Sequence, residues 1–280
     1  MKVKITADST CDLSPELIEK WGIVITPLSV SCDGQSYLDG TEIDPDRLFE
    51  ITESTGGTAS TTAVNVQQYL DVFGRILDEY DEIVHFTISS AMSACYQNAC
   101  IAAEELGHIY PVDSANLSTG IGHLVLDACE MAAEGMSGAA IKAALDEKKA
   151  KLDVSFVLST LEYLRRGGRC TTLTAMGANL LKLHPCIVVQ DGKMSVGKKY
   201  RGNIQASLVQ YVKDKLAEPD TLDLSRIFIT DSGFDEETRL LVEKTLLACA
   251  PFKEVIHTRA GCTVSCHCGP GCLGILFYRK

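Results

Sequence analysis

Residues 2–22 read KVKITADSTCDLSPELIEKWG, and this stretch carries the signals of a strand, a polar turn and a helix. The apolar strand ends at Asp8, where short polar residues begin a turn. Ser14 then supplies a helix N-cap, Pro15 occupies the first helical position, and Gly22 follows the end of a short helix. A strand followed by a helix is the repeating element of α/β proteins, so we expect an α/β fold.

The same alternation of apolar runs and helical patterns continues beyond this stretch. Further strands are predicted at residues 23–30, 83–88, 108–112, 154–158, 226–230 and 253–257. Helices are predicted from Asp44-Pro45 onward and at residues 93–106, 119–133 and 138–151. Strands that alternate with helices favour a mostly parallel sheet.

The pattern changes after the stretch 161–169, which reads LEYLRRGGR and breaks at paired glycines. Two short strands are predicted within residues 186–200 around Asp191-Gly192, a strong signal for a two-residue hairpin. The apolar run at 274–278 predicts one more strand, which must insert into a sheet to be buried.

These differences divide the sequence into two predicted domains. Residues 1–160 are expected to form an N-terminal α/β domain with a mostly parallel sheet flanked by helices. Residues 161–280 are expected to form a C-terminal α/β domain with a mixed or antiparallel sheet.

Charge and hydropathy argue against several classes of protein. The chain has 26 Lys and Arg against 37 Asp and Glu, and the formal charge of -11 disfavours a nucleic-acid-binding surface. The longest stretch without charged residues, 83–103, contains His, Thr, Gln, Asn and several Ser, so it is too polar to span a membrane. Asp8 lies where a signal peptide would need its apolar segment, so we expect a cytoplasmic protein without stable membrane insertion. In that compartment, most of the twelve cysteines are expected to be reduced thiols.

The sequence lacks the common signatures of nucleotide and hydrolase chemistry. No Gly-x-x-x-x-Gly-Lys-Ser/Thr loop is present to hold nucleotide phosphates, and Gly120-Ile121-Gly122 lacks the third glycine of a dinucleotide fingerprint. There is also no Gly-x-Ser-x-Gly elbow and no His-Glu-x-x-His motif. We therefore expect no cofactor and no ATP binding by this chain alone.

Two turns are predicted to be rich in hydroxyl groups. Residues 58–62 read TASTT, and residues 87–93 read TISSAMS where a predicted strand ends and a helix begins. Hydroxyls and free backbone N–H groups at such a point, with the positive end of the helix dipole behind them, can hold a carboxylate or a phosphate. The alternative is that these hydroxyls only fix the turns, with Ser93 as the N-cap of the helix.

An Asp-Ser pair follows three of the predicted apolar strands. The pairs are Asp8-Ser9, Asp113-Ser114 and Asp231-Ser232. Ligands of open parallel sheets collect at the carboxyl ends of the strands, so these pairs are candidate edges of a site. Turn chemistry alone is the other explanation.

Residues 262–272 read CTVSCHCGPGC and allow two interpretations. In the first, Cys262, Cys266, Cys268 and Cys272 hold a metal or act in redox chemistry. The spacing is not the paired C-x2-C of common zinc sites, and on an extended segment the second and third cysteines would point to the same face. In the second, His267 is the working group, and the Gly-Pro-Gly turn after it brings the backbone close to a ligand.

Basic residues gather after the predicted domain boundary. They are Arg165, Arg166, Arg169, Lys193, Lys198, Lys199 and Arg201. They form either a solvated face or a docking patch for an acidic partner.

Four motifs occur together in one order along the chain. They are DSTCDL at 8–13, SSAMSACYQNA at 89–99, LRRGGR at 164–169 and HCGPG at 267–271. With these motifs, the sequence resembles the DegV family of bacterial fatty-acid-binding proteins over essentially its whole length.

The resemblance implies a two-domain α/β protein that is not itself an enzyme. A long-chain fatty acid would be buried between the domains, with its tail in an apolar tunnel and its carboxylate on hydroxyl side chains. Some members of the family are the binding subunit of a fatty acid kinase. In that system a separate ATP-dependent kinase subunit converts the presented carboxylate to an acyl phosphate for phospholipid synthesis.

The resemblance also implies roles for particular residues. One carboxylate-binding hydroxyl maps onto Ser60 or Thr61 and another onto Ser93, with His267 close to the head group. The expected surface for the kinase subunit consists of Arg169, Lys198, Lys199 and Arg201.

The sequence departs from the family pattern at three places. The usual Thr-Ser-Gln-Pro-Ser tract reads STTAV at 60–64, which leaves the binding hydroxyl open between Ser60 and Thr61. The usual Ser-Gly-Thr-Tyr reads SACY at 93–96, which keeps the serine and replaces its neighbours. The four cysteines around His267 are not part of the pattern.

Two alternatives from other classes stay open at this point. The cysteines at 262–272 could make the chain a metal or redox protein. Ser93 could instead be a nucleophile with His267 as its base in acyl-ester hydrolysis, although no activating partner is evident in the sequence.

Overall fold

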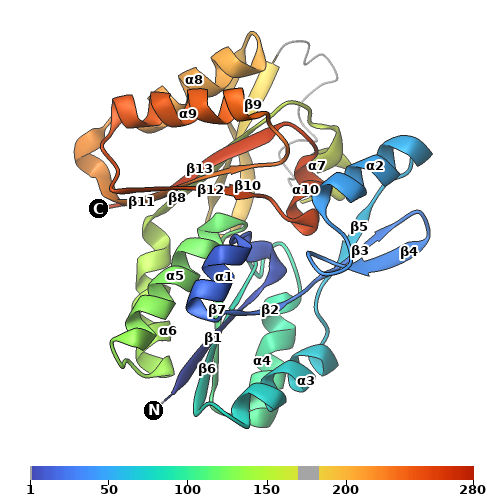
Figure 1. The fold of residues 1–280 in the computed structure, drawn as a ribbon, viewed down its shortest axis with the longest axis vertical. Helices are drawn as coiled ribbons and strands as arrows, with labels where there is room; N and C mark the ends of the chain where they lie inside the picture. Colours follow the sequence, from blue (N-terminus) through green and yellow to red (C-terminus); the bar gives the residue numbers. More distant parts are fainter. Residues whose placement is uncertain (1, 170–182) are drawn as a thin grey trace. The chain divides into compact units, whose positions relative to one another are not determined.

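The computed structural model describes residues 2–169 and 183–280 and divides the chain into two compact units, each of which can be followed in Figure 1. Unit 1 consists of Met1–Ala150 and Gly261–Val264, and unit 2 of Lys151–Ala260 and Ser265–Lys280. The segment Gly261–Val264 therefore belongs to unit 1 although it follows most of unit 2 in the sequence.

A four-stranded parallel sheet forms the centre of unit 1. Its strands are β1 (Val3–Asp8), β2 (Val24–Thr26), β6 (Glu82–Thr87) and β7 (Ile109–Asp113), in the order β2-β1-β6-β7. Every residue of β6 is buried, as expected for a central strand of a sheet covered on both faces.

Helices cover both faces of this sheet (Figure 1). Helices α3 (Val66–Leu77) and α4 (Cys95–Leu106) lie on one face, and α5 (Thr119–Ala133) and α6 (Gly138–Lys148) on the other. Tyr69, Phe73 and Ile83 belong to the apolar core between the first pair of helices and the sheet. The remaining elements around the sheet are η1 (Ser9–Cys11), α1 (Pro15–Trp21) and η2 (Lys149–Lys151).

Local signals place several helix ends in unit 1 where the sequence predicts them. Helix α1 starts at Pro15 and stops at Gly22, which adopts the left-handed conformation with φ of 59°. Helix α2 (Pro45–Thr55) starts after Asp44, whose side chain accepts a hydrogen bond from the Arg47 amide at 2.8 Å.

Unit 1 also contains a small antiparallel sheet, and its strands differ from two of the predictions. It contains β3 (Ser29–Cys32), β4 (Gln35–Leu38) and β5 (Ser60–Thr62), in the order β4-β3-β5. The single strand predicted at 23–30 is wrong, because the chain leaves the parallel sheet at Pro27, which has no N–H to donate, and enters this sheet at Ser29. The hydroxyl-rich segment predicted as a turn at 58–62 ends in a short edge strand.

Unit 2 contains a six-stranded mixed sheet. Its strands are β8 (Leu152–Leu158), β9 (Leu183–Gln190), β10 (Lys193–Arg201), β11 (Leu222–Asp231), β12 (Glu254–Arg259) and β13 (Cys272–Arg279), in the order β10-β9-β8-β13-β11-β12. Among these six described strands, β11 and β12 are the one parallel pair. The predicted hairpin is present, since Asp191 and Gly192 have φ of 49° and 75° between β9 and β10.

The apolar strand predicted near the end of the sequence does insert into this sheet. Strand β13 pairs with β8 on one side and with β11 on the other. At Gly274 a side chain has no room, because an added Cβ would lie 2.7 Å from the Ser155 carbonyl oxygen.

Two helices cover one face of the mixed sheet (Figure 1). They are α8 (Ile204–Lys215) and α9 (Glu236–Cys249), and their apolar residues share one core with the strands. Within that core, the Tyr211 hydroxyl donates to the Ser155 carbonyl at 2.7 Å and accepts from the Ile275 amide at 3.1 Å. The other helices described in unit 2 are α7 (Glu162–Gly167), η4 (Pro219–Thr221) and the end of α10 (Cys262–Cys268).

The predicted fold class is confirmed: a parallel α/β sheet with flanking helices is followed by an α/β region with a mixed sheet. Within residues 2–169 and 183–280, no helix has the length and the apolar composition needed to cross a membrane.

Candidate functional site

The carboxyl ends of β1, β6 and β7 lie next to one another in the parallel sheet of unit 1. Asp8 ends β1, the turn at 88–93 follows β6, and Asp113 ends β7. Two of the predicted Asp-Ser pairs and one predicted hydroxyl-rich turn therefore share one edge of the sheet, which is where open parallel sheets bind ligands.

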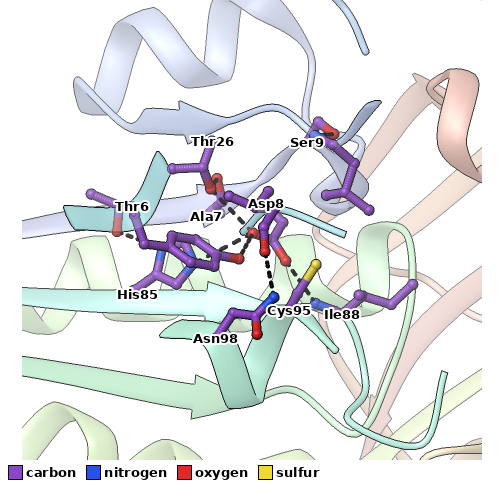
Figure 2. Close-up of polar contacts among 12 residues, drawn as sticks. Thr6, Ala7, Asp8, Ser9, Thr26, His85, Ile88, Cys95 and Asn98 are labelled. Carbon is purple, nitrogen blue, oxygen red and sulfur yellow. Dashed lines mark hydrogen bonds and ion pairs between the residues drawn. The ribbon is translucent and has the colours of Figure 1, made fainter. Parts of the chain in front are cut away.

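Asp8 is the centre of a buried hydrogen-bond network at this edge (Figure 2). Its Oδ1 accepts from the Tyr69 hydroxyl at 2.7 Å and from the Thr26 hydroxyl at 3.1 Å. Its Oδ2 accepts from the Ile88 amide at 3.4 Å, and the Nε2 atom of His85 lies 3.4 Å from Oδ1. These contacts offset the cost of burying a carboxylate, and the Ile88 contact ties it to the start of the turn that leads to Ser93.

Asp113 holds the other side of this turn. Its carboxylate accepts from the backbone amide and the hydroxyl of Ser90, and also from the Ala115 amide at 2.9 Å. The Ser89 amide donates to the Asn116 carbonyl at 2.9 Å. Ser89 and Ser90 therefore mainly fix the shape of the turn, which is the alternative that the sequence left open for its hydroxyl groups.

Ser93 lies just before helix α4 and is half-buried. The prediction that the helix begins at Ser93 is wrong, because α4 begins at Cys95 and the cap position is Ala94. The Ser93 hydroxyl nevertheless accepts from the Cys95 amide at 3.3 Å and donates to the Cys95 sulfur at 3.2 Å. It is therefore a hydroxyl at a helix N-terminus, as the predicted carboxylate site requires.

The described contacts of Ser93 give no support to the nucleophile alternative. Its hydrogen-bond acceptor is the Cys95 thiol, and burial raises the pKa of that thiol to about 12. A protonated thiol is not a base that could activate a serine.

Ser60 and Thr61 lie in the small antiparallel sheet, on β5, whereas Ser93 lies beside the parallel sheet. Ser60 pairs with Ser31 and is exposed, while Thr61 pairs with Val30 and is half-buried. Successive side chains of a strand point to opposite faces, so only one of these two hydroxyls can face a given ligand.

A second acidic pair anchors the N-terminus of helix α10 in unit 1. Asp39 accepts from the Cys262 amide at 2.8 Å and from the Thr263 amide at 3.1 Å. Asp12 accepts from the Gly261 amide at 2.9 Å, and the Ser118 hydroxyl lies 2.5 Å from its other oxygen. Residues 262–268 are helical, so the argument that the second and third cysteines share the face of an extended segment does not apply to them.

The cysteine-cluster alternative receives no support from the part of the chain that the structure describes. No three His, Cys, Asp or Glu side chains there are grouped so that they could hold a metal ion. Cys262, Cys266, Cys268 and Cys272 are all buried free thiols. A hydrogen bond to Cys268, together with burial, raises the pKa of Cys272, which keeps that thiol protonated.

In unit 2, the LRRGGR motif packs against the HCGPG motif. A Cβ atom added at Gly167 would collide with the ring of His267, and one added at Gly269 would collide with Tyr163. Burial, together with the positive charge of Arg169, lowers the pKa of His267 to about 4. The imidazole is therefore neutral at pH 7, and it can offer a hydrogen bond but no positive charge.

The third Asp-Ser pair fixes this glycine turn. The Ser232 hydroxyl donates to the Gly269 carbonyl at 2.5 Å and accepts from the Cys272 amide at 3.0 Å. Asp231 accepts from the amides of Gly233 and Phe234 at 2.7 and 2.8 Å. Turn chemistry accounts for these contacts.

Three of the residues predicted to bind a partner lie on the edge strand β10: Lys198, Lys199 and Arg201. Lys198 forms an ion pair with Asp214 of α8 at 2.5 Å, and its Nζ atom lies 5.4 Å from the centre of the buried Tyr200 ring. Lys199 and Arg201 are exposed, and strand alternation directs them to the face opposite to Tyr200. The fourth residue, Arg169, follows α7, is exposed and donates to the Gly167 carbonyl at 2.6 Å.

Sequence reasoning missed most of the network around Asp8. It marked the Asp8-Ser9 pair as a site edge but gave no role to Tyr69, His85 or Cys95. Tyr69 lies 61 positions from Asp8 and belongs to another element. Its place on the buried face of α3 is equally typical of a core residue, so no local signal distinguished it.

The fold is that of an α/β protein, and the polar turns lie at the edge of its parallel sheet where proteins of this class bind ligands. More specifically, the chain belongs to the DegV family, whose family model matches residues 2–280. This match confirms the resemblance drawn from the four sequence motifs.

Individual relatives match the chain over its whole length. A DegV domain-containing protein of Clostridium acetobutylicum is 32% identical over 283 residues, which cover 100% of this chain and 99% of that protein. A fatty-acid-binding DegV family protein of Thermus thermophilus is 28% identical, with 100% of both chains covered and a TM-score of 0.89. A stearic-acid-binding protein of Eubacterium ventriosum is 27% identical, with 99% of this chain and 98% of that chain covered and a TM-score of 0.84.

Proposed function

We propose that this chain binds one long-chain fatty acid and holds its carboxylate at the turn that ends in Ser93. The main support is the structural similarity, over 100% of both chains, to a DegV family protein of Thermus thermophilus that binds fatty acid. The half-buried Ser93 hydroxyl at the N-terminus of α4 supports the same proposal, because it is a neutral donor backed by a helix dipole.

The energetics of such a site are favourable. Burial of an acyl tail contributes about 0.8 kcal/mol per methylene, so a long tail supplies most of the affinity. An unpaired buried carboxylate costs several kcal/mol, and hydroxyl and backbone N–H donors offset that cost. A head-group site made of neutral donors suits a chain whose formal charge is -11.

The proposal includes two further head-group contacts that come from the family resemblance. One is the hydroxyl of Ser60 or Thr61, and the other is His267. At pH 7 the imidazole of His267 would act as a neutral hydrogen-bonding group, since its pKa is lowered to about 4.

We also propose that the chain is itself a carrier, which presents its fatty acid to another protein and does not transform it. A separate ATP-dependent kinase subunit in the cytoplasm would then form the acyl phosphate. We propose that this kinase subunit docks on the exposed side chains of Arg169, Lys199 and Arg201. Lys198 would contribute less, because it already forms an ion pair with Asp214. Exposed cations of this kind favour an acidic partner surface.

The first experiment is to extract the purified, untagged protein with organic solvent and to identify the released lipid by mass spectrometry. One fatty acid per chain on the native protein is expected. A protein that is empty, and stays empty after incubation with palmitic and stearic acid, contradicts the proposal.

The second experiment replaces Ser93 by Ala and measures fatty-acid affinity by isothermal titration calorimetry. We expect a loss of about tenfold, because a hydrogen bond to a charged group contributes roughly 1.5 kcal/mol or more. The control is Ser54→Ala on α2, where the hydroxyl donates to the Ile51 carbonyl of its own helix. Unchanged affinity in Ser93→Ala, and also in the double variant Ser60→Ala with Thr61→Ala, rules out this head-group site.

A further inference from the structure

Three exposed leucines form an apolar patch on helix α9 of unit 2. Leu240, Leu241 and Leu247 are 55%, 36% and 45% exposed. Among residues 2–169 and 183–280, the only other exposed large apolar side chain is Ile101, on α4. Single exposed leucines are common on soluble proteins, but several on one helix are typical of an interaction surface.

The patch lies on the side of α9 that points away from the mixed sheet. Helix α9 covers one face of this sheet beside α8 (Figure 1). Its Thr238, Val242 and Leu246, which are spaced by four residues, are buried on the sheet side. Leu240 and Leu247 are separated by about two helical turns, so they share one face, and their exposure places that face on the other side of the helix. In a single copy of the chain this apolar surface is therefore left to solvent.

Two opposite charges flank the patch. Glu237 and Lys244 are both exposed, and they are also separated by about two helical turns. They therefore lie on the same flank of the helix, with Leu240 and Leu241 midway between them along its length.

The neighbouring charges of α9 already have partners within unit 2. An Arg239 guanidinium nitrogen lies 3.5 Å from an Asp231 carboxylate oxygen. A Glu243 carboxylate oxygen lies 3.0 Å from the Nε2 atom of His257, which is on β12. Arg239 and Glu243 are therefore committed to contacts within their own unit.

The patch complements itself when two α9 helices pack in antiparallel orientation. A twofold axis between Leu240 and Leu241 places these residues against the same residues of a second copy. The same rotation keeps each flank of one helix beside the same flank of the other, so Glu237 meets Lys244 of the second copy. An isologous contact of this kind uses one patch twice and closes after two copies.

We propose that this chain forms a homodimer through α9, with a second copy of the chain as the partner of the leucine patch. The leucines supply the affinity, because burial of apolar surface drives association. The pairs of Glu237 with Lys244 fix the antiparallel register, because exposed ion pairs contribute little energy but select between arrangements. An anionic lipid surface is a poorer partner for a chain with a formal charge of -11. The dimer goes beyond fatty-acid binding and does not depend on it.

Sedimentation velocity of the purified chain tests the dimer over a range of protein concentrations. With rising concentration, we expect the mass to change from the 30.3 kDa of one chain to twice that value. Leu240→Asp should raise the dissociation constant of the dimer about tenfold or more, because each copy then brings a charge to the centre of the contact. The matched control is Ile101→Asp on α4, which also turns an exposed apolar side chain into a carboxylate and should leave the constant unchanged.

Charge reversal tests the arrangement within the dimer. Lys244→Glu places two glutamates beside each other in both flanking pairs, so the dissociation constant should rise about tenfold. The double variant Glu237→Lys with Lys244→Glu restores opposite charges, so its constant should return to within about threefold of the unmodified value. Lys193→Glu on β10 changes the net charge as much as Lys244→Glu does and should have no effect.

The outcomes separate the dimer from other uses of the patch. A mass that stays at 30.3 kDa at every concentration overturns the proposal, and so does a dimer that is equally tight in Leu240→Asp. A double variant that dimerises as weakly as Lys244→Glu overturns the antiparallel pairing. Binding of a monomeric chain to phosphatidylcholine vesicles, lost in Leu240→Asp, would assign the patch to a lipid surface and overturn the dimer. Affinity for palmitic acid, measured in parallel, should be the same in Leu240→Asp as in the unmodified chain, so fatty-acid binding is judged independently.

Discussion

The substitution Asp12→Asn tests the consequence of burying an acid beside the start of α10. Asp12 is 6% exposed, and burial, with the charge of Asp39 adding to it, raises its pKa from 3.8 to about 8. An asparagine amide can keep both contacts, since its oxygen accepts from the Gly261 amide and its nitrogen donates to the Ser118 hydroxyl. Asparagine also tolerates the left-handed backbone at this position, where φ is 50°.

The pH dependence follows from proton release on unfolding. Between about pH 4 and pH 8 the folded state holds the Asp12 proton and the unfolded state does not, so the free energy of unfolding falls as the pH rises through this window. Above about pH 8 neither state holds the proton, and the dependence ends. A pKa raised from 3.8 to about 8 corresponds to on the order of 5 kcal/mol over the window.

The Asp12→Asn variant has no carboxyl proton to release at position 12, so its free energy of unfolding should not fall between about pH 4 and pH 8 for this reason. We expect its free energy of unfolding to match that of the unmodified protein near pH 4 and to exceed it by several kcal/mol near pH 8. The assay is urea unfolding at a series of pH values, followed by Trp21 fluorescence, because Trp21 lies on α1 of unit 1. Asp33→Asn is the control, since Asp33 has φ of 49° as well but is exposed. Equal pH slopes for the unmodified protein and Asp12→Asn would refute the reasoning.

Two further predictions concern unit 2. Burial and the charge of Arg169 lower the pKa of His267 to about 4. In an NMR titration its imidazole should therefore have a midpoint near 4, and the substitution Arg169→Gln should raise that midpoint. A midpoint near 6.5 in the unmodified protein contradicts this prediction. Replacing Lys199 and Arg201 together by Glu should lower phosphorylation of the bound fatty acid by a kinase subunit by about tenfold and leave fatty-acid affinity unchanged. Lys193→Glu on the same strand is the matched control, and an equal loss there argues against a specific docking patch.

The parts of the fold that the sequence predicts well are those with local physical causes. Gly22 stops α1 because it adopts a left-handed conformation, and Asp191-Gly192 forms a hairpin turn for the same reason. The break between β2 and β3 also had a local signal in Pro27, which sits inside an otherwise continuous apolar run. That signal was outweighed by the β-propensity of the residues around it.

The helix at 262–268 could not be predicted from its own residues. Its N-terminal amides are satisfied by Asp39, which lies 223 positions away from Cys262 in the sequence. The segment also contains Cys, Thr and Val, which are weak helix formers, so tertiary contacts decide its conformation.

The candidate site was predictable to the extent that it lies in turns. The edge formed by Asp8 and the segment 88–93 follows from strand ends and polar residues, both visible in the sequence. The hydrogen bond from Tyr69 to Asp8 depends on how helix α3 packs on the sheet. Periodicity reports that such residues are buried and does not report what they touch.

The position of β13 has a consequence for how unit 2 is made. During synthesis, β8 and β11 leave the ribosome well before residues 272–279, yet β13 must lie between them. The centre of the sheet therefore waits for β13, whose pairing with β8 joins residues far apart in the sequence, and non-local pairing of this kind slows folding. Until then β8 and β11 each present an unpaired edge, so the nascent chain is exposed to wrong strand pairing until residues 272–279 have been made.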